Sequence, residues 1–341
     1  MSKKIKKIVC FGGGNAVPKL LLESLKKYPV KITGITSMVD NGGSAGQLRE
    51  DFDVLPPGDI RRHILALSDA PKWKKELLKF RFGREKFPGG HKGHNFANVF
   101  IVGLEYILKD YRKVIEIMHN FMEIKKQHQA LPATIDKVQL TAELENGKIV
   151  KGEDEIDVPK THNPKLKIKK VYLKPKGKVF PQTKKAVIEA DLITLGPGDL
   201  YSSIIPCLLS EGIKKAFKKS KAKKVLIVNP MTKFGETNNF SVLDFTNEIE
   251  KYMGCPLDFV IYNTEIPNEK RGEEYKKETP SIQDLVKIDK NLNKKKFIGK
   301  NLLVKSGPII YDSKKVVKAI LNLCQVVKIR PLPAQRIKIN N

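Results

Sequence analysis

Residues 8–15 read IVCFGGGN, an apolar run followed by three glycines, and this stretch decides the fold class. The apolar run predicts a short buried strand, and leucines between positions 16 and 27 give the next segment one apolar helical face. A second strand is expected over 30–36. This order of strand, glycine loop, helix and strand opens an α/β fold of the doubly wound, Rossmann-like type, with a mostly parallel sheet.

Three further loops carry glycines. They read DNGGSAG at 40–46, GHN at 93–95 and GPGD at 196–199. A glycine loop between a strand and a helix lets the backbone approach an anion closely, and the helix N-terminus points unpaired N–H groups at that anion. Several such loops at one sheet edge predict a site for a nucleotide or another polyphosphate.

The chain divides into four expected parts. Residues 1–135 form an N-terminal Rossmann-like, nucleotide-binding part, and 136–185 form an inserted β-rich, Lys-rich excursion with a hairpin signal at Asn146-Gly147. Residues 186–265 form a second α/β part of the same domain. Residues 266–341 hold a charged, loop-like segment and a C-terminal helix over 313–327.

The remaining elements follow from periodicity and capping signals. Asp59 is the expected N-cap of a helix that runs through Leu67, and Asn95 is the expected N-cap of another. The other expected helices cover 96–108, 111–124, 200–209 and 240–253, and the other expected strands cover 138–144, 148–150, 190–195, 225–229 and 257–263.

Composition limits the classes of function. Lys and Arg number 64 against 37 Asp and Glu, for a net charge of +27, which would suit a polyanionic partner. The excess is lysine, however, and it is spread from Lys3 to Lys338 without a nucleic-acid-binding signature. We therefore expect no specific nucleic-acid function.

The cysteines and the N-terminus indicate an intracellular protein. The four cysteines lie apart in apolar segments without a CxxC pair, which predicts buried thiols and no metal or redox role. Residues 2–7 do not resemble a signal peptide, and no apolar stretch reaches the roughly 18 residues of a membrane span. We expect a cytoplasmic location and no membrane span.

Several side chains in these loops suit a nucleotide. Asp40 is placed to accept from a ribose or to hold a divalent ion, and Ser44 suits a phosphate. Arg61 lies in a first helical turn, where the helix dipole disfavours cations, which indicates an anionic partner. A lone histidine such as His94 is more often a hydrogen-bonding residue than a general base. Residues 229–237 (NPMTKFGET) add amide, hydroxyl and carboxylate groups after a later strand.

Taken in order, these motifs resemble one family. The glycines at 12–14, the 40–46 loop, PPGDIR at 56–61, GH at 93–94, LGPG at 195–198 and the residues of 231–237 all follow the order of the bacterial gluconeogenesis factors (YvcK). That family is a branch of the CofD-like superfamily, which includes 2-phospho-L-lactate transferases. The resemblance covers residues 8 to about 245.

The resemblance implies a function. It implies a regulatory protein that binds a UDP-sugar, expected to be UDP-N-acetylglucosamine, and that is needed for cell shape and for growth on gluconeogenic carbon sources. The alternative is a CofD-type 2-phospho-L-lactate transferase, in which Asp40 would be catalytic by holding Mg²⁺. A third hypothesis is a Lys-rich nucleic-acid-binding protein. A homo-oligomer and a protein partner stay open.

The predicted nucleotide-binding residues come from all of these loops. They are Gly12, Gly13, Gly14, Asn15, Asp40, Asn41, Gly42, Gly43, Ser44, Asp59, Arg61, His94, Asn95, Asn98, Gly196, Gly198, Ser202, Asn229, Thr232, Glu236 and Thr237.

Overall fold

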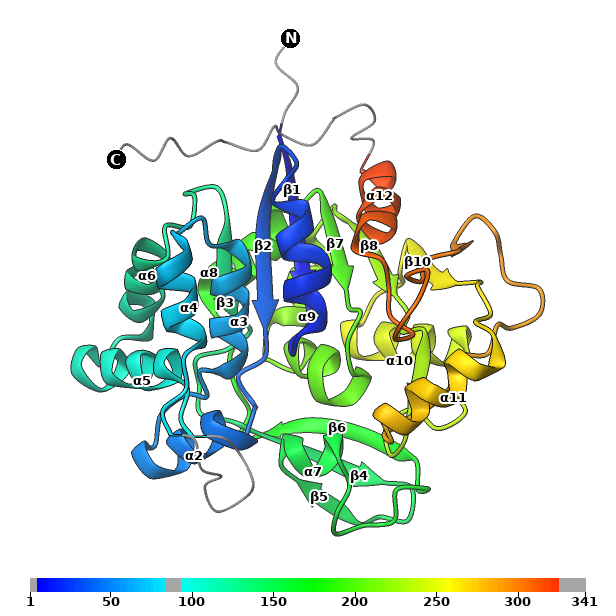
Figure 1. The fold of residues 1–341 in the computed structure, drawn as a ribbon, viewed down its shortest axis with the longest axis horizontal. Coiled ribbons are helices and arrows are strands. Elements are labelled where there is room, and N and C mark those ends of the chain that lie inside the picture. The colour runs from blue at the N-terminus through cyan, green and yellow to red at the C-terminus, as the bar shows by residue number, and fades with distance from the viewer. Residues whose placement is uncertain (1–4, 84–92, 325–341) are drawn as a thin grey trace.

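The computed structural model describes residues 5–83 and 93–324 (Figure 1). The strands are β1 (Lys6–Phe11), β2 (Val30–Thr36), β3 (Gln129–Pro132), β4 (Gln139–Leu144), β5 (Ile149–Lys151), β6 (Ile168–Lys174), β7 (Leu192–Leu195), β8 (Lys223–Ile227), β9 (Met231–Lys233), β10 (Phe259–Asn263), β11 (Ile282–Leu285) and β12 (Phe297–Lys300).

Helices separate most of these strands. They are η1 (Val17–Leu22), α1 (Glu23–Leu25), α2 (Gly43–Phe52), α3 (Gly58–Leu67), α4 (Lys72–Lys79), α5 (Phe96–Leu108), α6 (Tyr111–Phe121), α7 (Glu153–Asp157), α8 (Pro181–Glu189), η2 (Leu200–Ile204), η3 (Ile205–Leu208), α9 (Ile213–Lys219), α10 (Val242–Met253), α11 (Glu269–Glu278) and α12 (Ser313–Leu323).

The main sheet has seven strands in the order β12-β10-β8-β7-β1-β2-β3, and all six neighbouring pairs are parallel. The chain winds outward from β1 in one direction through β2 and β3, and then in the other through β7, β8, β10 and β12. This is the doubly wound, Rossmann-like topology that the sequence predicts. The winding reverses between β1 and β7, where ligands bind in such sheets, beyond the carboxyl ends of the strands.

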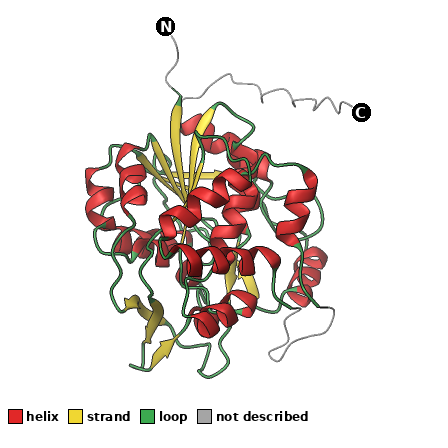
Figure 2. Ribbon diagram, turned by 90° about the vertical axis from the view of Figure 1, so that its left-hand side faces the viewer, coloured by secondary structure: helices red, strands yellow, loops and turns green. Residues whose placement is uncertain are grey.

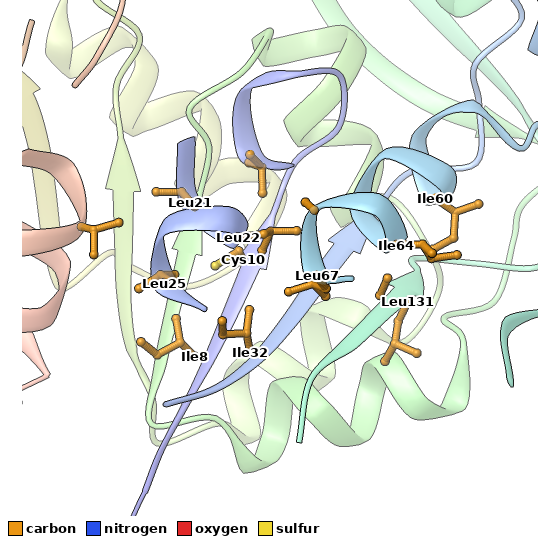
Figure 3. Packing of buried hydrophobic residues seen from close by; sticks show 14 of the residues in the cluster. Ile8, Cys10, Leu21, Leu22, Leu25, Ile32, Ile60, Ile64, Leu67 and Leu131 are labelled. Atoms are coloured by element: carbon orange, nitrogen blue, oxygen red, sulfur yellow. The ribbon is translucent and has the colours of Figure 1, made fainter. Parts of the chain in front are cut away.

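Alternation of side chains explains why β1 lies at the centre. Ile8 and Cys10 belong to the core on one face of the sheet, and Val9 and Phe11 belong to the core on the other. Helices η1, α1, α3 and α12 cover the first face, and α8, α9 and α10 cover the second. Figure 3 shows the first core, in which Leu21, Leu22 and Leu25 pack over the strands.

A separate three-stranded antiparallel sheet, in the order β5-β4-β6, lies between β3 and α8 along the chain. In Figure 1 it lies at the lower edge of the molecule, the end towards which β2 points. Figure 2 shows it apart from the parallel strands. It forms the predicted β-rich insertion, and it also carries the short helix α7, which the sequence did not predict.

Other local predictions need correction. Asp59 is not an N-cap, because α3 begins at Gly58 with Pro57 in the cap position and no side-chain cap. The 268–300 segment is not only loop: it contains α11, β11 and β12, and β12 extends the main sheet. The segments predicted as plain α-helices over 16–27 and 200–209 begin with a π-helical turn.

Some predictions agree with the structure in part. Asn95 does cap α5, since its side chain accepts from the N–H of Asn98. Helix α12 covers 313–323, and positions 325–327 of the predicted helix lie outside the described residues. Three of the four thiols are buried, whereas Cys255 is half-buried. In the part of the chain that the structure describes, no helix is long and apolar enough to cross a membrane.

Candidate functional site

A pocket of about 520 Å³ opens at the carboxyl edge of the main sheet, between the loops at that edge and helix α7 of the insertion. Its walls come from the loops after β1, β2 and β7, from the starts of α2 and α3, from α5 and η2, and from α7 with the residues that follow it. The predicted residues that line it are Gly14, Asp40, Gly42, Gly43, Ser44, Asp59, Arg61, Asn98 and Ser202.

The glycines after β1 are required by local geometry. Gly14 has φ of +62°, and a Cβ on Gly13 would lie 2.3 Å from Oδ2 of Asp59. The N–H of Gly14 donates to Oδ1 of Asp59 at 3.0 Å. The loop is thus fastened to the first turn of α3, and any side chain at position 13 would push Asp59 away.

The first turn of α2 faces the pocket. The cap residue Gly42 provides no side-chain bond, and Gly43, Ser44 and Ala45 all line the cavity. A Cβ at Gly46 would lie 2.0 Å from the carbonyl oxygen of Asn41, so the turn is tightly folded. An uncapped helix N-terminus that faces a cavity suits an anion.

Arg61 brings a buried positive charge to the pocket that the start of α2 also lines. The residue is only 8% exposed, it lines the pocket, and its Nε has no hydrogen-bond partner among the described residues. Burial, together with the charges of Arg62 and Arg81, lowers the pKa of Arg61 to about 10. A buried guanidinium donor without a partner is costly unless an anion completes it.

Ser44 connects α2 to α5. Its Oγ accepts from the N–H of Asn95 and from Nδ2 of Asn98, each at 3.2 Å, and it lies 3.2 Å from Nδ1 of His94. His94 and Asn95 therefore position Ser44 and do not themselves line the cavity. The nucleotide-binding role of His94 stays a prediction.

Two carboxylates stand beside the arginines. Asp59 accepts from Arg62 at 2.5 Å, and Asp40 accepts from the N–H of Gly42 at 3.0 Å. Burial, with the nearby charge of Asp59, raises the pKa of Asp40 to about 6. Asp40 is therefore protonated more easily than a free carboxylate, which lowers the repulsion of an anionic ligand next to it.

The opposite wall is acidic and comes from the insertion. Glu153, Asp154 and Asp157 of α7 line the pocket, and a carboxylate oxygen of Asp199 lies within 4.8 Å of one from Asp157. Burial, and then the charge of Asp40, raises the pKa of Glu153 to about 10. Carboxyl and carboxylate oxygens accept hydrogen bonds from hydroxyl groups, so this wall suits a sugar or a ribose.

Lys233 lies behind the acidic wall, at the end of β9. Its Nζ contacts Asp157, Oδ2 of Asp199 at 3.0 Å and Oε1 of Glu236 at 3.5 Å. Glu236 is buried beneath η2, where it accepts from the N–H of Tyr201 and from Oγ of Ser202, both at 2.8 Å. Glu236 thus positions Ser202 from below the cavity.

The remaining predicted residues brace the loops and do not line the cavity. Asn229 accepts from the N–H of Gly198 and donates to its carbonyl oxygen, both at 2.9 Å, which holds the loop after β7. Asn41 accepts from the N–H of Asp154 in α7 at 3.0 Å and donates to the carboxylate of the same residue at 2.5 Å. Oγ1 of Thr232 bonds the backbone of Asp284, and Oγ1 of Thr237 accepts from the N–H of Lys233. The cavity lining also omits Gly12, Gly13, Asn15 and Gly196.

Sequence reasoning missed most of the acidic wall. The signal was present as EDEID at 153–157, an acidic run in a Lys-rich stretch, but a single helical turn has no periodicity to detect. It also left out Arg81 and Lys160 as site residues.

Comparison with known proteins agrees with the fold. The family model described as 2-phospho-L-lactate transferase CofD matches residues 8–303. A relative from Clostridium acetobutylicum is 36% identical over 323 residues, which are 92% of this chain and 69% of the relative. The gluconeogenesis factor of Bacillus subtilis is 35% identical over 321 residues, which are 93% of this chain and 98% of that protein.

A solved structure agrees as well. The crystal structure of a UPF0052-family protein from Bacillus halodurans superposes with a TM-score of 0.83 at 32% identity, and it covers 94% of this chain and 100% of its own. The motifs that line and brace the pocket all fall within the matched residues. The chain belongs to the CofD family and, within it, groups with the gluconeogenesis factors.

Proposed function

We propose that this chain is a cytoplasmic regulatory protein that binds a nucleotide sugar, with UDP-N-acetylglucosamine as the first ligand to test. The observation that supports this most is Arg61, a buried cation that lines the cavity together with the start of α2 and whose Nε has no partner among residues 5–83 and 93–324. The diphosphate would lie against the basic wall of the pocket, formed by Arg61 and the first turn of α2. The hydroxyls of the ribose and the sugar would lie against the acidic wall.

The names of the relatives support a proposal for the biological role. Relatives in Bacillus subtilis and Listeria innocua are named gluconeogenesis factors. We propose that ligand occupancy of the pocket regulates growth on gluconeogenic carbon sources and cell shape, and that no turnover of the ligand is needed.

The test is a thermal shift series followed by calorimetry. UDP-N-acetylglucosamine, UDP-glucose, UDP, N-acetylglucosamine and a DNA duplex are each added to the full chain, because a ligand that binds only the folded state raises the melting temperature. We expect the UDP-sugars to raise it most, UDP less and the free sugar not at all. An equal response to the free sugar, or no response to any UDP compound, would contradict the proposal.

The CofD-type transferase is the second candidate, and it depends on Asp40. Asp40 and Asp59 face one cavity and could hold a divalent ion that neutralises phosphate charge, but Arg62 and the N–H of Gly14 already bond Asp59. For a regulator, Asp40→Asn should weaken binding by about 1 to 3 kcal/mol, with or without Mg²⁺. Mg²⁺-dependent phospholactyl transfer by the wild type, detected by mass spectrometry and lost in Asp40→Asn, would favour the enzyme instead.

A further inference from the structure

Lys233 differs from the other lysines of this basic protein in its surroundings. Its side chain is 9% exposed, and its Nζ lies among three carboxylates that come from three separate segments. Asp157 belongs to α7 of the insertion, Asp199 to the loop after β7, and Glu236 to the turn after β9. One ammonium group therefore joins the insertion to the main α/β domain.

The three carboxylates need the positive charge of Lys233 to stay close to one another. One oxygen from each of Asp157, Asp199 and Glu236 lies within 4.8 Å of the other two. Even with Lys233 in place, burial raises the pKa of Glu236 to about 7, and burial also raises the pKa of Asp199 above its usual range. Without a cation, like charges at this spacing would repel one another and push α7 away.

The groups around Nζ of Lys233 are oxygen atoms of the kind that a hard cation binds. Three carboxylate oxygens surround it, and Oγ of Ser202 bridges Asp157 at 2.9 Å and Glu236 at 2.8 Å. Oxygen ligands of this kind bind Mg²⁺ and Ca²⁺, and a lysine ammonium is a compact point charge that can take the same position.

The second attachment of α7 does not rely on a cation. Nδ2 of Asn41 donates to Asp154 at 2.5 Å, and the N–H of Asp154 donates back to Oδ1 of Asn41 at 3.0 Å. The helix is thus fastened on one side by an amide pair and on the other by Lys233 together with the hydroxyl of Ser202. Loss of the lysine would free only the side of α7 that faces Ser202 and Asp199.

We propose that Lys233 is a positioning residue that takes the place of a divalent cation, so that the acidic wall of the pocket stays closed and nucleotide-sugar binding needs no metal. This inference rests on the proposed function for its ligand, but not for its cation site. Removal of Lys233 should convert the three carboxylates into a metal site that the wild type does not have.

The first experiment tests the cation site without any nucleotide. Tb³⁺ is titrated into wild type, Lys233→Met and the double variant Lys233→Met/Glu236→Gln, and its luminescence is measured. Circular dichroism checks that each protein is folded. Lys233→Met should bind Tb³⁺ at least about tenfold more tightly than the wild type, and the double variant should lose that gain. A folded Lys233→Met that binds Tb³⁺ no better than the wild type would overturn the proposal, whatever the nucleotide result.

The second experiment measures affinity for UDP-N-acetylglucosamine by calorimetry, in chelator and in Mg²⁺. The wild type should bind equally in both, and Lys233→Met should bind about tenfold more weakly in chelator and recover in Mg²⁺, a recovery that a merely structural role would not produce. Lys296→Met is the control, because it removes a partly buried lysine paired with Glu250 at 2.6 Å outside the pocket. Unchanged affinity of Lys233→Met in chelator would overturn the proposal.

Asp157→Asn covers the case in which Lys233→Met does not fold. It leaves Lys233 paired with Asp199 and Glu236 and removes only the carboxylate charge that α7 places against Lys233. Binding of UDP-N-acetylglucosamine should weaken and should not recover in Mg²⁺, because Lys233 still occupies the cation position. Wild-type affinity in this variant would also count against the proposal. No response of any protein to the nucleotide, together with a Tb³⁺ gain in Lys233→Met, would contradict the proposed function alone.

Discussion

The two walls of the pocket differ in how their buried cations are paired. On the basic wall, Arg61 is buried, and its Nε has no partner in the part of the chain that the structure describes. On the acidic wall, Lys233 is equally buried but contacts three carboxylates. Arg61 is therefore available to bind a ligand, whereas Lys233 is already paired within the protein. The local pairing of each cation, and not the net charge of +27, therefore indicates where an anion binds.

The largest effect should come from the loop that supports the basic wall. Gly13→Val would place a Cβ 2.3 Å from Oδ2 of Asp59, which must then move with the start of α3. We expect no measurable binding of UDP-N-acetylglucosamine by calorimetry, with circular dichroism close to that of the wild type. Gly272→Val is the control, since a Cβ there has no neighbour within 4 Å. Unchanged affinity of a folded Gly13→Val would refute this role of the loop.

Arg61→Met should separate binding from stability. Loss of the guanidinium should weaken nucleotide-sugar binding by about 10-fold to 100-fold, the usual value of a hydrogen bond to a charged group. The ligand-free protein should melt at the same or a higher temperature, because a buried cation without a full set of partners is replaced by an apolar side chain. Arg112→Met, which removes an exposed arginine paired with Asp110, should change neither quantity. A large fall in ligand-free melting temperature would show that Arg61 serves the fold.

Asp40 should give the ligand-free protein a dependence on pH. Its pKa is raised from 3.8 to about 6 in the fold, so between these values the folded state binds more protons than the unfolded state. The contribution of Asp40 to stability is therefore greatest at low pH and is lost as the pH rises towards 6. Chemical denaturation at several pH values should show this slope, and Asp40→Asn should reduce it. The same slope in both proteins would mean that Asp40 is not the titrating group.

The smallest effect concerns nucleic acid. If the surface lysines form no recognition groove, a DNA duplex should bind weakly and should lose most of its affinity between low and physiological salt. Fluorescence anisotropy with two unrelated duplexes tests this. Tight, sequence-dependent binding at physiological salt would instead support the nucleic-acid hypothesis.

Sequence could predict the parts of the site that are local. The strand, the glycines at 12–14 and the cap at Asn95 are each determined by a few neighbouring residues, and the structure contains all of them. The parallel order of the sheet then brings the loops to one edge.

The rest depends on contacts between residues far apart in the chain. Lys233 and Asp157 are separated by 76 positions, and no local pattern links them. Asp59 illustrates the same limit: its place at the start of a helix predicts a cap, but its side chain instead accepts from Gly14, 45 positions away. Asn229 and Glu236 are predicted nucleotide-binding residues, and in the structure their side chains contact the loops around the cavity.

The arrangement of Lys233 and the insertion also has a consequence for synthesis. The ribosome produces the carboxylates of α7 first, then Asp199 and, 34 residues after that, Lys233. A nascent chain that ends before β9 thus carries the acidic helix without its counter-charge, while the glycine loops and Arg61 are already present. The pocket can reach its final form only after residue 236 has left the exit tunnel, so a chain released early should fold its first strands and still fail to retain the ligand.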